Sequence, residues 1–277
     1  MTNLENKVII IAGASGGIGS ATALLLARHG AILVIASRRI DPRDPLMEEI
    51  GVFSPVSSSF RGDLSHPEAW KELVRYVERK YQSIHGLVNC VGTLNSKNLE
   101  QLSECEIESA MRENFLSVIY GAQAVLPTMR RQKRGAIITI GSLGGTVPMP
   151  FASLYCATKH AVRGFSLSLS EELKGTGITA SLLSLGPVHT RMLETEALSK
   201  RSVIAFINSP LPPARVAESI VSLLRRPRRE MILPRMTGAL SIICSIVPSL
   251  FGICYRILRQ VGIVRLESYR RKHSVPT

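Results

Sequence analysis

Tyr155 and Lys159 stand four residues apart in a segment whose pattern predicts a helix, so their side chains share one helix face. A tyrosine hydroxyl exchanges protons poorly near neutrality, because its unperturbed pKa is about 10. A cation held about 4 Å away, at an effective dielectric constant of about 20, favours the phenolate by roughly 4 kcal/mol, or about three pKa units. The spacing therefore predicts a tyrosine that exchanges protons near pH 7, although these five residues alone are more often typical of an exposed helix.

Two segments with the pattern of buried strands lead into further residues that could take part in chemistry or in ligand binding. Ala136 to Ile140 is an apolar run that leads into Gly141-Ser142, so it presents a serine hydroxyl at the end of a strand. Val8 to Ala12 is a second such run, and it opens directly into Gly13-Ala14-Ser15-Gly16-Gly17-Ile18-Gly19, after which a helical pattern begins. A strand, a glycine turn and a helix in this order are the context that a dinucleotide-binding fingerprint requires, since the glycines admit a pyrophosphate and the helix N-terminus offers it free amides.

Taken together, the glycine turn, Ser142 and the Tyr155/Lys159 pair resemble the short-chain dehydrogenase/reductase family over residues 7 to 234. The resemblance implies a Rossmann fold, that is, a single doubly wound α/β domain with a mostly parallel sheet. It also implies reversible hydride transfer between a nicotinamide cofactor and a carbonyl or secondary alcohol. In such an enzyme Ser142 would polarise the substrate oxygen and Tyr155 would pass the proton. Lys159 would lower the tyrosine pKa and hold the nicotinamide ribose, and Asn114 would keep a water in the proton relay.

The resemblance also implies cofactor contacts along the chain. Asp63 would contact the adenine, while Val188 and Thr190 would reach the nicotinamide carboxamide or a phosphate. Asn89 and Gly92 match the family's Asn-Asn-Ala-Gly turn, from which this sequence departs at the two middle positions. The complete expected cofactor-binding set is Gly13, Ser15, Gly16, Gly17, Ile18, Gly19, Arg38, Arg39, Asp63, Leu64, Asn89, Gly92, Tyr155, Lys159, Pro187, Val188 and Thr190.

The end of the second predicted strand, Ile32 to Ala36, indicates which nicotinamide cofactor is preferred. Enzymes that prefer NAD place an acidic residue there to hold the ribose 2′-hydroxyl, whereas an arginine accommodates a 2′-phosphate. Here Ser37 is followed by Arg38 and Arg39, and Asp41 comes several residues late. The sequence therefore favours NADP(H) over NAD, unless the two arginines are only solvated.

Length and composition limit the other possibilities. The 277 residues suffice for one large domain with an appendage, and 20% charged with 45% hydrophobic residues is a globular composition. Five cysteines without metal-ligand spacing indicate a reducing, cytoplasmic compartment and no metal site, and no secretory signal is expected. The 34 basic and 21 acidic residues give a net charge of +13, of which +9 lies from residue 215 onward. A nucleic-acid partner is not expected, because aromatic residues make up only 5% and no docking motif is present.

Residues 236–277 form a hydrophobic, basic tail after the expected catalytic domain, residues 1–235. Met236 to Tyr255 contains no charge, and a helix of that length could cross the roughly 30 Å core of a bilayer. Pro248 interrupts it, however, and small polar residues recur every four positions, as a helix in the membrane interface or packed on its own domain would allow. Three arrangements stay open, namely peripheral attachment to an anionic membrane surface, a span, and burial against a sister subunit.

The remaining pattern predicts two long helices, Glu100 to Leu126 and Phe151 to Leu173. The resemblance implies that residues 191 to 213 form a lid over the substrate. The apolar content of the lid suggests a substrate with hydrophobic bulk. Pairing through the two long helices into a homodimer or homotetramer is usual in the family. The alternative function is a non-catalytic regulatory protein that senses NADP(H), which would need no proton relay.

Overall fold

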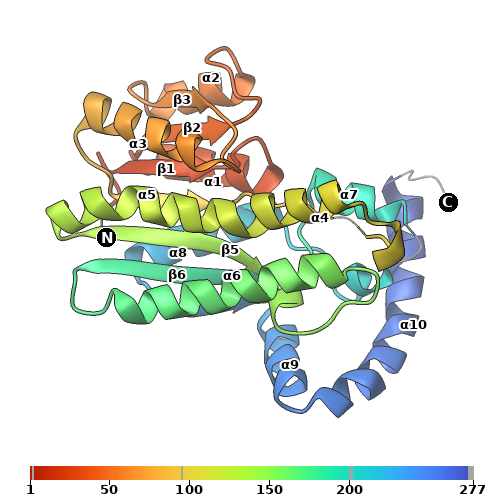
Figure 1. Ribbon diagram of the computed structural model, residues 1–277. Coiled ribbons are helices and arrows are strands. Elements are labelled where there is room, and N and C mark those ends of the chain that lie inside the picture. The colour runs from red at the N-terminus through yellow and green to blue at the C-terminus, as the bar shows by residue number, and fades with distance from the viewer. Residues whose placement is uncertain (2, 95, 200–201, 274–277) are drawn as a thin grey trace.

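A seven-stranded parallel sheet forms the centre of the protein (Figure 1). This computed structural model describes residues 1, 3–94, 96–199 and 202–273, so residues 200 and 201 of the expected lid and 274–277 of the expected tail lie outside it. The strands are β1 (Val8–Ala12), β2 (Ile32–Ser37), β3 (Ser58–Arg61), β4 (Gly86–Asn89), β5 (Gly135–Ser142), β6 (Ile178–Leu185) and β7 (Glu230–Leu233). They lie in the order β3-β2-β1-β4-β5-β6-β7, and every neighbouring pair is parallel. The predicted doubly wound α/β fold is confirmed, and its strand order reverses between β1 and β4, where sheets of this kind bind ligands.

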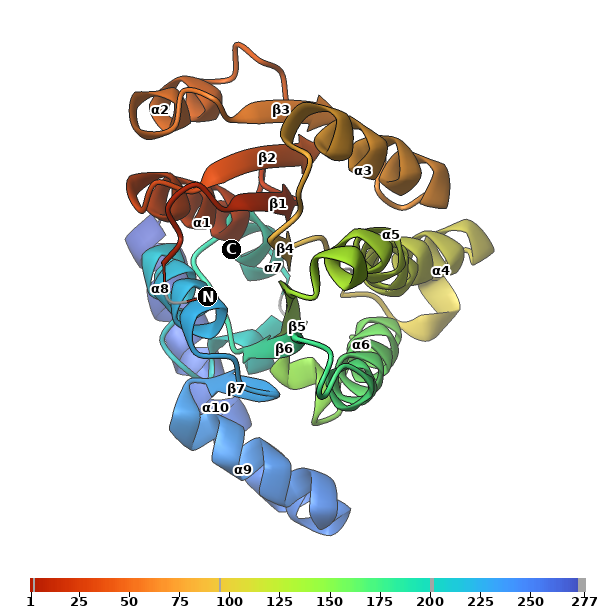
Figure 2. The ribbon, with the colours of Figure 1, turned by 90° about the vertical axis from the view of Figure 1, so that its left-hand side faces the viewer.

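Helices cover both faces of the sheet (Figure 2). They are α1 (Gly17–Arg28), α2 (Pro45–Phe53), α3 (Pro67–Tyr81), α4 (Glu104–Met111), α5 (Ser117–Gln132), α6 (Ser153–Glu172), α7 (Arg191–Ala197), α8 (Pro213–Arg225), α9 (Arg235–Ile246) and α10 (Pro248–His273). Three short 3-10 turns, η1 (Leu99–Gln101), η3 (Leu143–Gly145) and η4 (Ser202–Phe206), and one π turn, η2 (Arg112–Leu116), complete the set. α1 and α8 pack together on one face, and α3, α5 and α6 cover the other.

The central strand β1 illustrates how the sequence produces this layered core. Ile9 and Ile11 belong to the apolar cluster under α1 and α8, whereas Val8 and Ile10 belong to the cluster that contains Trp70 of α3. Side chains alternate between the two faces of a strand, so a strand covered by helices on both sides needs an unbroken apolar run. The first strand has such a run, and its end is thereby held rigidly at the carboxyl edge of the sheet.

The long helix expected over Glu100 to Leu126 is wrong in its boundaries. α4 begins later because Ser103 caps it: the Ser103 hydroxyl accepts a hydrogen bond from the Glu106 amide, and the Glu106 carboxylate accepts one from the Ser103 amide. The π turn η2 then joins α4 to α5, and α5 continues past Pro127. Proline lacks an amide hydrogen and so frees the carbonyl of Gln123, but Gln123 is exposed and water can satisfy that oxygen.

Beyond β7 the chain forms two helices that extend from the edge of the sheet (Figures 1 and 2). The apolar tail is divided immediately before Pro248, so α9 and α10 are separate helices. The last turns of α10 return to the domain, where Leu266 and Tyr269 pack with Phe206 of η4. Among the described residues, no helix is both long enough and apolar enough to cross a membrane.

Candidate active site

The glycine turn after β1 opens a groove of about 260 Å³ at the carboxyl ends of β1, β2 and β4. Gly13 has a φ of +82°, a conformation that residues with a Cβ rarely adopt. A Cβ on Gly19 would lie only 2.6 Å from the Cα of Ala14, so α1 packs against the turn more closely than any larger residue would allow. Of the expected cofactor-binding residues, those that line the groove are Gly13, Ser15, Gly16, Gly17, Ile18, Gly19, Arg38, Asp63, Leu64, Gly92 and Thr190.

The end of β2 presents one of the two expected arginines to this groove. The hydroxyls of Ser37 and Ser15 are hydrogen-bonded at 3.0 Å, which ties the end of β2 to the glycine turn. Arg38 lines the groove and pairs with Glu113 at 3.2 Å, with 55% of its side chain still exposed. Arg39 is exposed and is not among the groove-lining residues.

Asp63 lies after β3 on the adenine side expected from the sequence. Its carboxylate accepts a hydrogen bond from the Ser65 amide at 3.0 Å. Burial alone would raise the pKa of Asp63, but the hydrogen bonds from Ser65 and the charges of Arg38 and His66 outweigh burial and lower it. The carboxylate is therefore ionised at neutral pH and acts only as a hydrogen-bond acceptor.

Asn89 ends β4 but is not among the residues that line the groove. Its Oδ1 accepts a hydrogen bond from the Val91 amide at 3.2 Å, while its buried Nδ2 has no partner in the part of the chain that the structure describes. The glycine cradle and the free amides at the start of α1 fit a nicotinamide dinucleotide.

The π turn η2 positions Asn114. The Asn114 side chain accepts a hydrogen bond from the Thr93 amide at 2.7 Å and donates to the Thr93 carbonyl at 2.9 Å and to the Thr158 hydroxyl at 3.2 Å. A Cβ on Gly92 would lie 3.4 Å from Asn114 Oδ1 and 3.3 Å from Lys159 Nζ. Asn114 and Lys159 therefore flank Gly92, and only a glycine leaves the space between them open.

Ser142, at the end of β5, meets Tyr155 and Lys159 of α6 at a second cavity of about 230 Å³. Ser142 lies close enough to Tyr155 to lower the pKa of its phenol, and the Ser142 hydroxyl oxygen accepts a hydrogen bond from the Gly144 amide at 3.0 Å. Lys159 Nζ lies 5.8 Å from the centre of the Tyr155 ring and donates to the Ile140 carbonyl oxygen at 3.3 Å. The structure thus brings these three expected catalytic residues together.

The electrostatics of the pair differ from the expectation that Lys159 moves the tyrosine pKa toward 7. Burial raises the pKa of Tyr155 to about 12, and the nearby Ser142 side chain offsets only part of this rise. Burial likewise lowers the pKa of Lys159 to about 8. The expectation of a lowered tyrosine pKa is wrong, because burial removes water from both groups and so disfavours the phenolate and the ammonium alike.

The groove and the cavity join at residues that line both of them. These are Ile18, Cys90, Val91, Gly92, Thr190 and Met192. The turn after β6 places Pro187 and Val188 on the cavity side of the junction. Thr190 packs against the start of α1, since a Cβ on Gly17 would lie 3.0 Å from Thr190 Cγ2. A ligand in the groove can therefore extend one end into the cavity beside Tyr155.

Glu196 of α7 is a cavity residue that the sequence did not reveal. Its buried carboxylate accepts hydrogen bonds from the hydroxyls of Ser96, at 2.6 Å, and Ser202. Its negative charge also contributes to the raised pKa of Tyr155. Glu196 lies in the expected lid, the least regular stretch of the sequence, where no periodic pattern pointed to a buried carboxylate.

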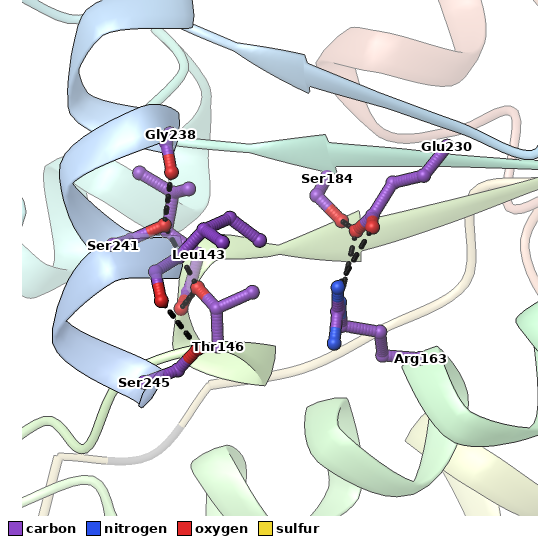
Figure 3. Close-up of polar contacts among 9 residues, drawn as sticks. Leu143, Thr146, Arg163, Ser184, Glu230, Gly238, Ser241 and Ser245 are labelled. Atoms are coloured by element: carbon purple, nitrogen blue, oxygen red, sulfur yellow. Dashed lines mark hydrogen bonds and ion pairs between the residues drawn. The ribbon is translucent and has the colours of Figure 1, made fainter. Parts of the chain in front are cut away.

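The two tail helices form a wall of the same cavity. The wall residues are Thr237, Leu240, Ser241 and Cys244 of α9 and Phe251, Cys254, Tyr255 and Leu258 of α10. Figure 3 shows how α9 is attached: the hydroxyls of Ser241 and Thr146 lie 3.1 Å apart, and Thr146 also contacts the Leu143 carbonyl oxygen at 2.7 Å. α9 is thus fixed to the turn that follows Ser142. The wall residues of α10 are spaced i, i+3, i+4, i+7, a signal in the sequence that could have revealed them.

Comparisons with known proteins agree with this geometry. A family model described as short chain dehydrogenase matches residues 7–201. An uncharacterized oxidoreductase of Staphylococcus saprophyticus is 31% identical over 236 residues, which cover 84% of this chain and 95% of that protein. An uncharacterized oxidoreductase of Listeria innocua is 36% identical over 194 residues, or 69% of this chain and 78% of that protein.

Solved structures share the fold at lower sequence identity. The ligand-free aldohexose dehydrogenase of Thermoplasma acidophilum has a TM-score of 0.73 and 22% identity, covering 84% of this chain and 94% of that one. A second dehydrogenase has a TM-score of 0.75 and 23% identity, covering 84% and 95%. The structures support the fold, and the family model and the sequence relatives establish that this chain is an oxidoreductase that belongs to the short-chain dehydrogenase family.

Proposed function

We propose that the protein transfers a hydride between NADP(H) and a carbonyl or secondary alcohol of an apolar substrate. The observation that carries this proposal is that Ser142, Tyr155 and Lys159 line the cavity that the glycine-lined groove joins. Apolar side chains such as Met149 and Leu258 form much of the cavity wall, which supports an apolar substrate.

Bound NADP(H) would supply or accept the hydride. The Ser142 hydroxyl, whose oxygen is held by the Gly144 amide, would donate a hydrogen bond to the substrate oxygen. Tyr155 has a raised pKa and is protonated at neutral pH, which is the form that donates a proton during carbonyl reduction. Lys159 would hold the ribose hydroxyls and would favour the phenolate as it develops. Asn114 forms hydrogen bonds with the Thr93 backbone and the Thr158 side chain. In the proposed mechanism, Asn114 would also hold a water molecule in the proton relay.

The substitution Tyr155→Phe tests this function, because it removes one hydroxyl and little else. General acid catalysis typically contributes about 100- to 10,000-fold, so NADPH oxidation over a panel of aldehydes and ketones should fall by about that factor. NADPH binding, followed by fluorescence titration, should be unchanged. Tyr120→Phe on α5, outside both the groove and the cavity, is the matched control. Unchanged turnover by the Tyr155→Phe variant would contradict the proposal. A wild-type protein that binds NADPH but reduces no carbonyl would favour the alternative function, a non-catalytic protein that senses NADP(H).

The preference for NADP(H) is supported by Ser37 at the end of β2 and by Arg38 in the groove. A charge-assisted hydrogen bond to a phosphate contributes about 1.5–3 kcal/mol, so Arg38→Ala should raise the KM for NADPH about tenfold or more. The KM for NADH should change by less than about twofold, since NADH carries no 2′-phosphate. Arg39→Ala is the control, because the Arg39 side chain lies outside the groove lining. Equal changes for the two cofactors would contradict a role of Arg38 at the 2′-phosphate.

The proposal also covers assembly and location. α5 and α6 run alongside each other on one face of the protein, and pairing through them would give a homodimer or homotetramer, which light scattering would detect (Figures 1 and 2). All five cysteines are free thiols, which supports a reducing, cytoplasmic location.

A further inference from the structure

The two tail helices carry most of the exposed large apolar side chains of the protein. Ten of the 17 such side chains among the described residues lie on them, and singly scattered surface residues would not gather in this way. The ten are Met236, Leu240, Ile243, Ile246 and Val247 on and after α9, and Leu250, Ile253, Ile257, Val261 and Val264 on α10. We call these ten residues the apolar stripe.

Apart from Leu240, which also lines the cavity, the stripe lies on a different face from the one that packs on the domain. On α9 the buried positions are Gly238, Ser241 and Cys244, whereas Met236, at 83% exposed, and Ile243, at 51%, face away from them. On α10, too, the residues that line the cavity differ from the exposed apolar residues. Ile253 is 61% and Ile257 is 66% exposed, and neither lines the cavity. Each tail helix therefore turns one face toward the domain and exposes a second face that is apolar.

The charges around the stripe indicate what covers it. Residues 235–273 contain seven lysines or arginines and one acidic residue, Glu267. Arg235, Arg256 and Arg259 are exposed and form no ion pair with any residue that the structure describes. An exposed apolar face on helices that also carry unpaired arginines suits an anionic lipid surface, where basic residues attract the headgroups. A second copy of this basic hairpin would bring like charges together, so it fits the stripe less well.

We infer that the α9–α10 hairpin docks on an anionic phospholipid bilayer, and that the substrate is a membrane-resident carbonyl or alcohol that reaches the cavity across this hairpin. The second half of this inference rests on the proposed function. Interfacial helices sink about 5–10 Å into the headgroup boundary, and a helix is about 10 Å across. Phe251, Tyr255 and Leu258 line the cavity from the same helix whose stripe would contact lipid. Only one helix therefore separates the docked bilayer from the site of Ser142 and Tyr155.

The docking half is tested by sedimentation of the full chain with phosphatidylcholine vesicles that contain or lack phosphatidylglycerol. Wild type should bind the anionic vesicles about tenfold or more tightly than the neutral ones, and added salt should weaken binding. The double variant Ile253→Glu/Ile257→Glu should lose affinity for anionic vesicles by about tenfold or more. The matched control is Val52→Glu/Val56→Glu, which places the same charges at exposed valines near α2, away from the tail. Circular dichroism and NADPH titration check that each variant is folded.

The substrate half is tested by NADPH oxidation with a long-chain ketone dissolved in anionic vesicles and with a short-chain ketone in buffer. The Ile253→Glu/Ile257→Glu variant should lose about tenfold in rate on the vesicle substrate and keep its rate on the short ketone, because neither residue lines the cavity. Equal rates of variant and wild type on the vesicle substrate would overturn the route across the hairpin.

The two proposals fail in different ways. Wild type that binds neither vesicle type, or binding that survives the double substitution, would overturn membrane docking whatever the enzymatic activity. A stable dimer that the double substitution converts to monomer, together with absent vesicle binding, would also overturn it, because a second copy would then cover the stripe. Vesicle binding without turnover of any ketone would refute the proposed function and the substrate route and leave docking supported.

Discussion

Replacement of the buried lysine in the site by methionine should stabilise the protein while it removes activity. Lys159 is only 5% exposed, and its ammonium donates to the Ile140 carbonyl oxygen but forms no ion pair with a carboxylate of the described chain. Burial lowers the pKa of Lys159 from its ordinary value of 10.5 to about 8. The difference of about 2.5 units corresponds to roughly 3 kcal/mol by which folding disfavours the charged form.

The sign of the pH dependence follows from this lowered pKa. The folded state binds fewer protons than the unfolded chain between the folded pKa of about 8 and the unfolded value of 10.5, so this group makes stability rise with pH across that window. Below pH 8 both states are protonated and the destabilisation is at its full value. Lys159→Met removes this destabilisation, but it also removes the hydrogen bond to the Ile140 carbonyl, which contributes roughly 1 kcal/mol. At pH 7 the free energy of unfolding should therefore rise by about 2 kcal/mol. At pH 9.5 the gain should fall below about 1 kcal/mol, because wild type has by then lost most of the penalty.

Urea denaturation followed by circular dichroism, at pH 7 and at pH 9.5, measures both values. Lys71→Met on α3 exchanges the same residue types at an exposed position and should change the free energy of unfolding by less than about 0.5 kcal/mol. NADPH oxidation by the Lys159→Met variant should be lost at either pH. A Lys159→Met protein that is less stable than wild type at pH 7, or a gain that does not shrink at pH 9.5, would refute the reasoning that burial governs this lysine.

Two further substitutions test how the site is held in place. Arg163→Met on α6 breaks a two-pronged ion pair with Glu230 of β7, at 3.0 and 2.9 Å, and leaves the carboxylate with only the Ser184 hydroxyl (Figure 3). Because the Arg163 side chain is 29% exposed, the free energy of unfolding should fall by about 2 kcal/mol, less than the 3–5 kcal/mol expected when a fully buried pair is broken. An unchanged midpoint of urea denaturation would contradict a stabilising role of this ion pair. Thr146→Val removes one hydroxyl from the contact with Ser241, which should cost about 1 kcal/mol and speed hydrogen exchange of the α9 amides more than that of β1. Equal effects on both elements would show that this contact does not anchor α9.

The parts of the site that the sequence predicted are those whose geometry is local. Tyr155 and Lys159 share a face because any α-helix places i and i+4 together, and Ser142 stands at the carboxyl edge because a buried strand ends there. The glycine turn was recognisable because Gly13 and Gly19 meet steric demands that no other residue satisfies. Helix boundaries were less predictable, since the cap at Ser103 competes with an apolar pattern that begins earlier in the chain.

What the sequence could not predict is the degree of burial, and burial decides the sign of the electrostatic effects. From the spacing alone, the attraction between Lys159 and Tyr155 is the only term available, and it lowers the tyrosine pKa. In the folded protein, walls from α7, α9 and α10 close the cavity, and these segments are distant in sequence. Exclusion of water raises the pKa of Tyr155 and lowers that of Lys159 through the same desolvation. Any change that opens the wall at Phe251 to water should therefore bring both pKa values toward their ordinary values, so the tail affects proton transfer as well as the shape of the cavity.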